Sequence, residues 1–166
     1  MNLVLQSSIK TLQKSSRLLD ILTNKQLSNH SVSPYYSSIG SHLRHIFDFY
    51  ACILNEDNLR IDLTTRNRDS NIESCCTSAS AYLKHLLNRL QNMSDDLEHE
   101  VYVIDDLGMG KIEMKYTLGA LLAQANSHTI HHYAIINYIL DRLNIAMNDD
   151  TFGYNPTTPR PEVNLN

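Results

Sequence analysis

Hydrophobic residues recur at helical spacing in four stretches of the chain. In each stretch, apolar side chains lie three or four positions apart with polar residues between them, which is typical of amphipathic helices. The predicted helices span residues 3–23, 34–55, 70–92 and 117–144. Ser33-Pro34, a hydroxyl cap followed by proline, supports the second start, and Ser70 with Glu73 fits a capping box at the third.

Three other stretches have different patterns. Residues 99–104 and 111–116 are rich in β-branched and aromatic side chains and flank a glycine-containing turn, which predicts a short β-hairpin before the last helix. The polar residues 56–69 form a connection long enough to cross a helical bundle. Residues 147–166 contain three of the four prolines, so we expect an irregular C-terminal tail, packed over the helices or partly loose. The predicted fold is all-α, a four-helix bundle with this hairpin added.

Composition narrows the class of protein. With 166 residues, of which 42% are hydrophobic, the chain can bury one core, so we expect a single domain over residues 1–166. The net charge is −4 and the basic residues are scattered, which argues against a nucleic-acid partner. There is no long apolar run, so we expect no membrane contact and a cytoplasmic location. Three cysteines, two of them adjacent, match no disulfide framework.

The last predicted helix contains two histidines at the spacing of metal ligands. His128 and His132 are four residues apart, so they stack one turn above the other on the same face. They belong to a stripe that we expect to face the core, made up of Leu121, Ala125, His128, His132, Ile135 and Ile139. His131 falls on the flank of this stripe, where we expect it to lie beside the ligands.

The second predicted helix offers two further histidines. His42 lies on its inward stripe and His45 about 60° away, so both can reach the interior and periodicity slightly favours His42. Asp48 follows His45 by three residues and could orient an imidazole or pair with Arg44 or Arg68. An exposed, salt-bridging carboxylate is the alternative for Asp48.

Converging imidazoles need partners. A buried polar group without a hydrogen bond costs about 1–3 kcal/mol, and one divalent metal ion would satisfy three imidazoles at once. Each second ring nitrogen would stay free to bond a carboxylate or carbonyl. The alternative is a set of core histidines that are hydrogen-bonded to the backbone, to tyrosine hydroxyls or to each other.

Two segments together resemble the DinB-like family of four-helix bundles. They are residues 38–48, SIGSHLRHIFD, and residues 127–132, SHTIHH; FGYNP at residues 152–156 also resembles the tail of one small subgroup. The resemblance implies an up-down-down-up topology and a divalent metal, zinc, nickel or iron, held by one histidine of the second helix and the last helix's HxxxH pair. Matched to the family motif, the ligands fall on His45, His128 and His132, with His42 as the alternate ligand. After the last ligand this chain has Tyr133-Ala134-Ile135 where many relatives have Arg-Gly-Gln.

Two functional hypotheses follow. The first is a metal-dependent enzyme, with the resemblance implying thiol S-transfer with a low-molecular-weight thiol, or hydrolysis, since a bound metal makes a nucleophile near neutral pH. The second is a non-catalytic, stress-related bundle protein in which the metal is structural or absent. A homodimer through an exposed bundle face is expected in either case.

Overall fold

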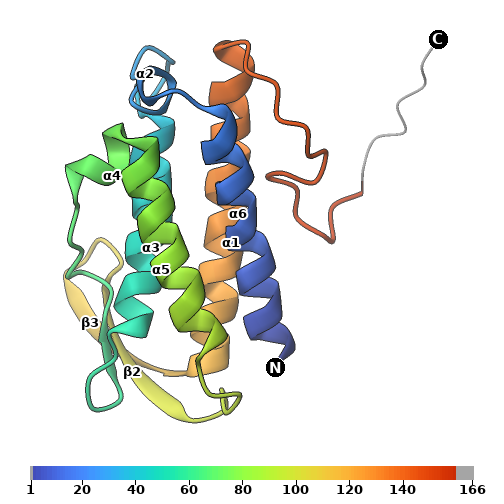
Figure 1. The fold of residues 1–166 in the computed structure, drawn as a ribbon. Helices are drawn as coiled ribbons and strands as arrows, with labels where there is room; N and C mark the ends of the chain where they lie inside the picture. Colours follow the sequence, from blue (N-terminus) through green and yellow to red (C-terminus); the bar gives the residue numbers. More distant parts are fainter. Residues whose placement is uncertain (1, 160–166) are drawn as a thin grey trace.

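The computed structural model describes residues 2–159 as six helices and one three-stranded sheet (Figure 1). The helices are α1 (Leu3–Ile21), α2 (Asn24–Leu27), α3 (Ile39–Leu54), α4 (Ser70–Ser74), α5 (Cys76–Gln91) and α6 (Leu118–Arg142). The strands are β1 (Arg60–Asp62), β2 (Glu100–Asp106) and β3 (Lys111–Thr117). The prediction of a mostly helical chain is confirmed, and the sheet is larger than the predicted hairpin.

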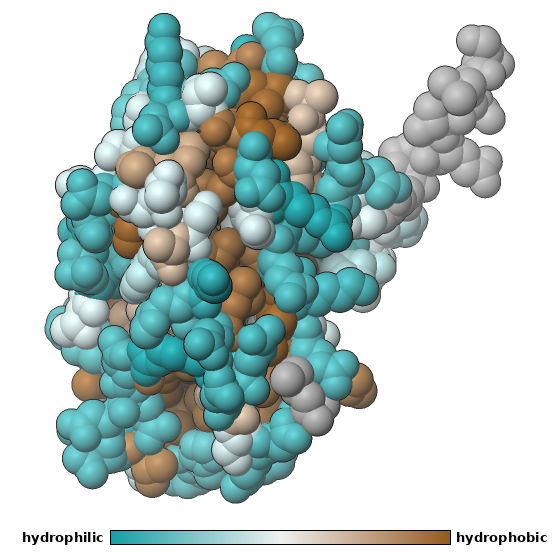
Figure 2. Space-filling view, viewed as in Figure 1, coloured by the Kyte–Doolittle hydropathy of each residue, from teal (hydrophilic) through white to brown (hydrophobic). Residues whose placement is uncertain are grey.

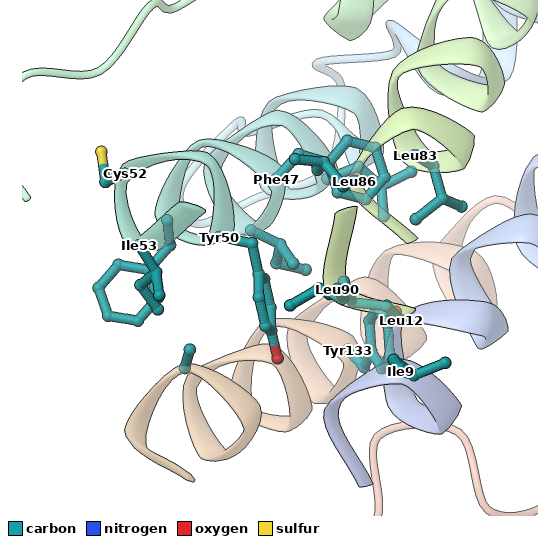
Figure 3. Packing of buried hydrophobic residues seen from close by; sticks show 14 of the residues in the cluster. Ile9, Leu12, Phe47, Tyr50, Cys52, Ile53, Leu83, Leu86, Leu90 and Tyr133 are labelled. Carbon is teal, nitrogen blue, oxygen red and sulfur yellow. The ribbon is translucent and has the colours of Figure 1, made fainter. Parts of the chain in front are cut away.

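The hydrophobic core lies among the four long helices. α1 packs against α5 and α6, and α3 packs against the same two helices. Figure 3 shows side chains from all four helices in this core, including Leu12, Tyr50, Leu90 and Tyr133. Hydrophilic residues cover most of the face in Figure 2, with hydrophobic residues in a band between them. No helix within residues 2–159 is long and apolar enough to cross a lipid bilayer.

Helix α3 begins later than the sequence pattern predicted. The cap is Ser38, whose hydroxyl accepts a hydrogen bond from the Ser41 N–H at 3.0 Å, and not Ser33. The residues after Ser33-Pro34 form a turn instead, in which Tyr35 is 80% exposed. The serine–proline signal was wrong because a second capping serine lies directly before the buried Ile39.

The predicted helix over residues 70–92 is two helices. Cys75 is extended, with φ of −129°, and separates α4 from α5. The cap of α4 is Asp69, one residue before the predicted Ser70, and the side chain of Glu73 bonds Arg44 and not the helix start. The break lets the first N–H of α5, at Cys76, donate to the side-chain oxygen of Asn24 at 2.9 Å.

The sheet contains the predicted hairpin and one strand that was not predicted. β2 and β3 pair antiparallel over their full length, as expected for residues 99–116. β1 adds a parallel neighbour on the other side of β2, with Ile61 opposite Val103. Both of these side chains are buried, and β1 contacts α3, so the sheet lies against the bundle.

The described part of the C-terminal tail packs on α6. Phe152 is fully buried and stacks on Tyr133, with ring centroids 4.4 Å apart. Gly153 has a φ of +76°, and a Cβ added there would lie 2.8 Å from the Cα of Ala134. The predicted irregular tail is confirmed over residues 147–159, and residues 160–166 lie outside the described part of the chain.

Candidate metal site

The histidines of α3 and α6 lie on the flanks of their helices and not on the core-facing stripe. On α6 the predicted positions Leu121, Ala125 and Ile139 are buried. Between them the buried residues are Thr129, Tyr133 and Ile136, each one position beyond the predicted stripe, and His128 and His132 are half-buried. The helix has this rotation because the hydroxyl of Tyr133 hydrogen-bonds to α1, at Ser15 and Thr11.

Both bonds join the buried Tyr133 side chain to α1. The Tyr133 hydroxyl is 2.5 Å from the Ser15 hydroxyl and donates to the Thr11 carbonyl at 3.1 Å. On α3 the interior is filled by Leu43, Ile46 and Phe47, which leaves both histidines of that helix half-buried. Because α3 and α6 pack together, the histidine-bearing flanks of the two helices face each other.

Three imidazoles from these flanks come together. The Nε2 atom of His128 is 2.8 Å from Nε2 of His45 and 3.1 Å from Nε2 of His132. One nitrogen from each of the three rings lies within 4.8 Å of the other two, so this group could hold a metal ion. Phe49 of α3 packs beside the group, with its ring centroid 5.3 Å from that of His128.

The donor set fits a transition metal. Zinc binds imidazole nitrogen at about 2.0–2.1 Å in tetrahedral geometry, which places neighbouring ligand nitrogens about 3.3 Å apart. The observed separations of 2.8 and 3.1 Å are therefore a few tenths of an ångström short of that geometry. The three rings are not fully buried, so they are not enclosed on every side by the core.

His42, which periodicity slightly favoured over His45 as the inward histidine of α3, lies outside the group of three. Its Nδ1 lies 2.8 Å from Nδ1 of His132, and its Nε2 lies 2.8 Å from the hydroxyl of Ser37. It therefore contacts the far side of the His132 ring, away from the three clustered nitrogens. A partner in that position orients a metal-binding imidazole.

The other two candidates lie further from the cluster. His131 is exposed, with its ring centroid 5.4 Å from that of His132, as expected for a residue beside the ligands. Asp48 is buried, so the interpretation as an exposed carboxylate is wrong. Its Oδ2 accepts a hydrogen bond from Arg44 at 2.7 Å and a longer one from the Arg68 backbone N–H, so it pairs with Arg44 and not with an imidazole.

The environment keeps the clustered imidazoles neutral. Burial, together with the charges of neighbouring histidines, lowers the pKa of His132 to about 2. Burial, followed by the positive charge of Arg66, lowers the pKa of His45 to about 3. Burial also lowers the pKa of His42 and His128. Because a metal binds the neutral ring, these imidazoles need not lose a proton first.

Sequence reasoning missed two residues that contact this group. Nη1 of Arg66, in the connection between β1 and α4, lies 2.8 Å from Nδ1 of His45. Ser37, just before α3, bonds His42. Both lie in irregular segments, where hydrophobic periodicity carries no information about side-chain direction.

Comparisons with protein-family models, with curated proteins and with solved structures found no match to this chain. The interpretation of the site therefore depends on its own geometry.

Proposed function

We propose that this protein is a metal-dependent enzyme that holds zinc, nickel or iron through His45, His128 and His132. The observation that supports this is the meeting of three half-buried imidazole nitrogens from two helices. Such an ion, when bound, lowers the pKa of a water or thiol and so supplies a nucleophile near neutral pH. The reaction class is thiol S-transfer or hydrolysis, with a small molecule or low-molecular-weight thiol as substrate.

The contacts around the three histidines support this function. His42 hydrogen-bonds the outer nitrogen of His132, and Ser37, just before α3, hydrogen-bonds His42, so one side of the site is supported by a chain of hydrogen bonds. Phe49 places an apolar ring beside His128. Because the three histidines are only half-buried, a small substrate could approach them from solvent.

We further propose that the fold is a DinB-like bundle with up-down-down-up topology. Support comes from the packing of α1 and α3 against both α5 and α6, and from the long connection between α3 and α5. In Figure 1, α3 and α5 run in one direction while α1 and α6 run in the other.

Metal content tests the proposal. Purified protein should contain one equivalent of a divalent metal by mass spectrometry, and a variant with His128→Ala and His132→Ala should have lost it. His131→Ala is the matched control, because it removes an exposed imidazole from the same helix and should retain the metal. Circular dichroism establishes that each variant is folded. Near-zero metal in all three proteins, also after incubation with zinc, nickel or iron(II), would refute the proposal.

Catalysis is tested on the same proteins. Conjugation of a small thiol to an electrophile should depend on the metal and fall to background in the double variant. Ester hydrolysis is the second assay.

A non-catalytic bundle is the second candidate function, favoured by one observation. Two of the clustered imidazoles already have hydrogen-bond partners on their outer nitrogens, since His42 bonds Nδ1 of His132 and Arg66 bonds Nδ1 of His45. A folded protein that binds no metal and catalyses neither reaction would favour this candidate.

A further inference from the structure

The contact between Arg66 and His45 determines where the proton of His45 lies. A guanidinium group has only N–H donors, so Nδ1 of His45, at 2.8 Å from Nη1 of Arg66, must accept. A neutral imidazole has one N–H and one acceptor nitrogen. The proton of His45 is therefore on Nε2, which donates to Nε2 of His128 at 2.8 Å.

The same proton occupies the position that a metal would need. His45 could bind an ion only through the lone pair of Nε2, which requires the N–H to move to Nδ1. There it would face the N–H of Arg66 at 2.8 Å, donor against donor. The ring is neutral in both arrangements, so the conflict concerns hydrogen-bond direction. A metal can enter only when Arg66 withdraws from His45.

On the other side of the three histidines, the hydrogen bonds from His132 through His42 to Ser37 have no such conflict. With Nε2 of His132 on a metal, its Nδ1 would carry the proton and donate to Nδ1 of His42, 2.8 Å away. Nε2 of His42 would then donate to the hydroxyl of Ser37, which can either donate or accept. The serine end can reverse its hydrogen bonds, whereas the arginine end cannot.

Arg66 lies beside the site without an ionic partner among the residues that the structure describes. Its Nε donates to the carbonyl of Leu63 at 3.0 Å, which keeps the guanidinium beside the site. Within residues 2–159, no carboxylate forms an ion pair with Arg66. Withdrawn from His45, this half-buried cation would need an anion, and a guanidinium suits an oxyanion.

We propose that Arg66 links metal binding to binding of an oxyanion, so that the site takes the metal together with a ligand carrying a carboxylate, sulfate-like or phosphate-like group. This inference rests on the proposed metal site and specifies its ligand class. Without the oxyanion, Arg66 competes with the metal for His45; with it, the guanidinium turns to the anion and releases Nδ1. The two ligands therefore bind with positive coupling.

Zinc affinity, measured by competition with a coloured chelator, tests this. Arg66→Met, which keeps the length of the side chain and removes its donors, should bind zinc about tenfold more tightly than the wild type in anion-poor buffer. Arg68→Met is the matched control: it removes the same charge two residues away, from an exposed side chain, and should leave the affinity within about twofold of wild type.

The anion is tested separately with sulfate and with acetate, at constant ionic strength maintained by perchlorate. At least one of them should raise the zinc affinity of the wild type severalfold and leave that of Arg66→Met unchanged. Equal zinc affinity of wild type and Arg66→Met, or an equal anion effect in both, would overturn the inference and leave the metal site intact. No zinc binding by any of the proteins would overturn the inference and the proposed function together.

Discussion

The ion pair between Arg44 and Asp48, four residues apart on α3, offers a sharp test of how a buried carboxylate is stabilised. Asp48 is 1% exposed and Arg44 14% exposed, and the guanidinium is 2.7 Å from Oδ2 of Asp48 and 2.6 Å from Oε1 of Glu73. Replacing Arg44 by methionine retains much of its apolar volume and leaves a carboxylate buried without a counter-charge. Breaking a buried pair in this way costs about 3–5 kcal/mol, and we expect about 3 because Glu73 is partly exposed.

Replacing Asp48 by asparagine should cost less. The amide oxygen can still accept from Arg44, and Arg44 retains Glu73, so we expect a loss of about 1 kcal/mol. In the double variant no buried charge is left unpaired, so its loss should be close to that of Asp48→Asn alone. The two substitutions should therefore be non-additive by about 3 kcal/mol.

The assay is urea unfolding followed by circular dichroism at pH 7 on all four members of this cycle. An unchanged slope of free energy against urea establishes that the unfolding transition is comparable between variants. Glu73→Gln is the control for a partner nearer the surface and should cost at most about 1 kcal/mol. A cost below about 1 kcal/mol for Arg44→Met, or full additivity in the cycle, would refute the role of Arg44 as the counter-charge of Asp48.

Two further predictions concern pH and the tail. Metal-free protein should lose stability as pH falls from about 7 to 4, because unfolded histidines take up protons near pH 6.5 while native His45 and His132, with pKa values of about 3 and 2, stay neutral. Because both rings are half-exposed, we expect the free energy of unfolding to fall by about 1 kcal/mol per pH unit, measured by urea unfolding at each pH. Equal stability at pH 7 and 5 would contradict this prediction. Gly153→Ala should lower stability by at least about 1 kcal/mol more than Gly110→Ala, since both glycines have positive φ and only an added Cβ at Gly153 meets backbone within 3 Å. Equal losses in thermal unfolding would show that Gly153 does not dock the tail.

The long helices were predictable because each buries one stripe against its neighbours, and that requirement appears directly as periodicity. The break at Cys75 was not predictable, since it depends on a hydrogen bond from Cys76 to Asn24, 52 residues away. β1 was missed for a similar reason. Its three residues are too few for a periodic signal, and its parallel partner β2 lies about 40 residues further along the chain.

The candidate site shows how precisely hydrophobic periodicity locates the buried face of a helix. Neighbouring residues on a helix are about 100° apart, so a stripe that is displaced by one position exchanges the core for the flank. Thr129 and Tyr133 were not part of the predicted stripe, and both are buried. Each has an internal partner, the carbonyl of Ala125 for Thr129 and Ser15 for Tyr133, so burial leaves their hydroxyls satisfied.

This displacement leaves His128 and His132 half-buried at the side of α6 and not enclosed in the core. A metal enclosed on the inward stripe, between Ala125 and Ile139, would have no side open to solvent, so it could serve only a structural purpose. Tyr133 instead fixes the rotation of α6 through α1, and Phe152 covers its ring from the tail. The adjacent His132, and His128 one turn away, are thereby held toward α3 at the edge of the bundle. Tyr133, whose burial the hydrophobic pattern did not predict, therefore also places the candidate site where a substrate could reach it.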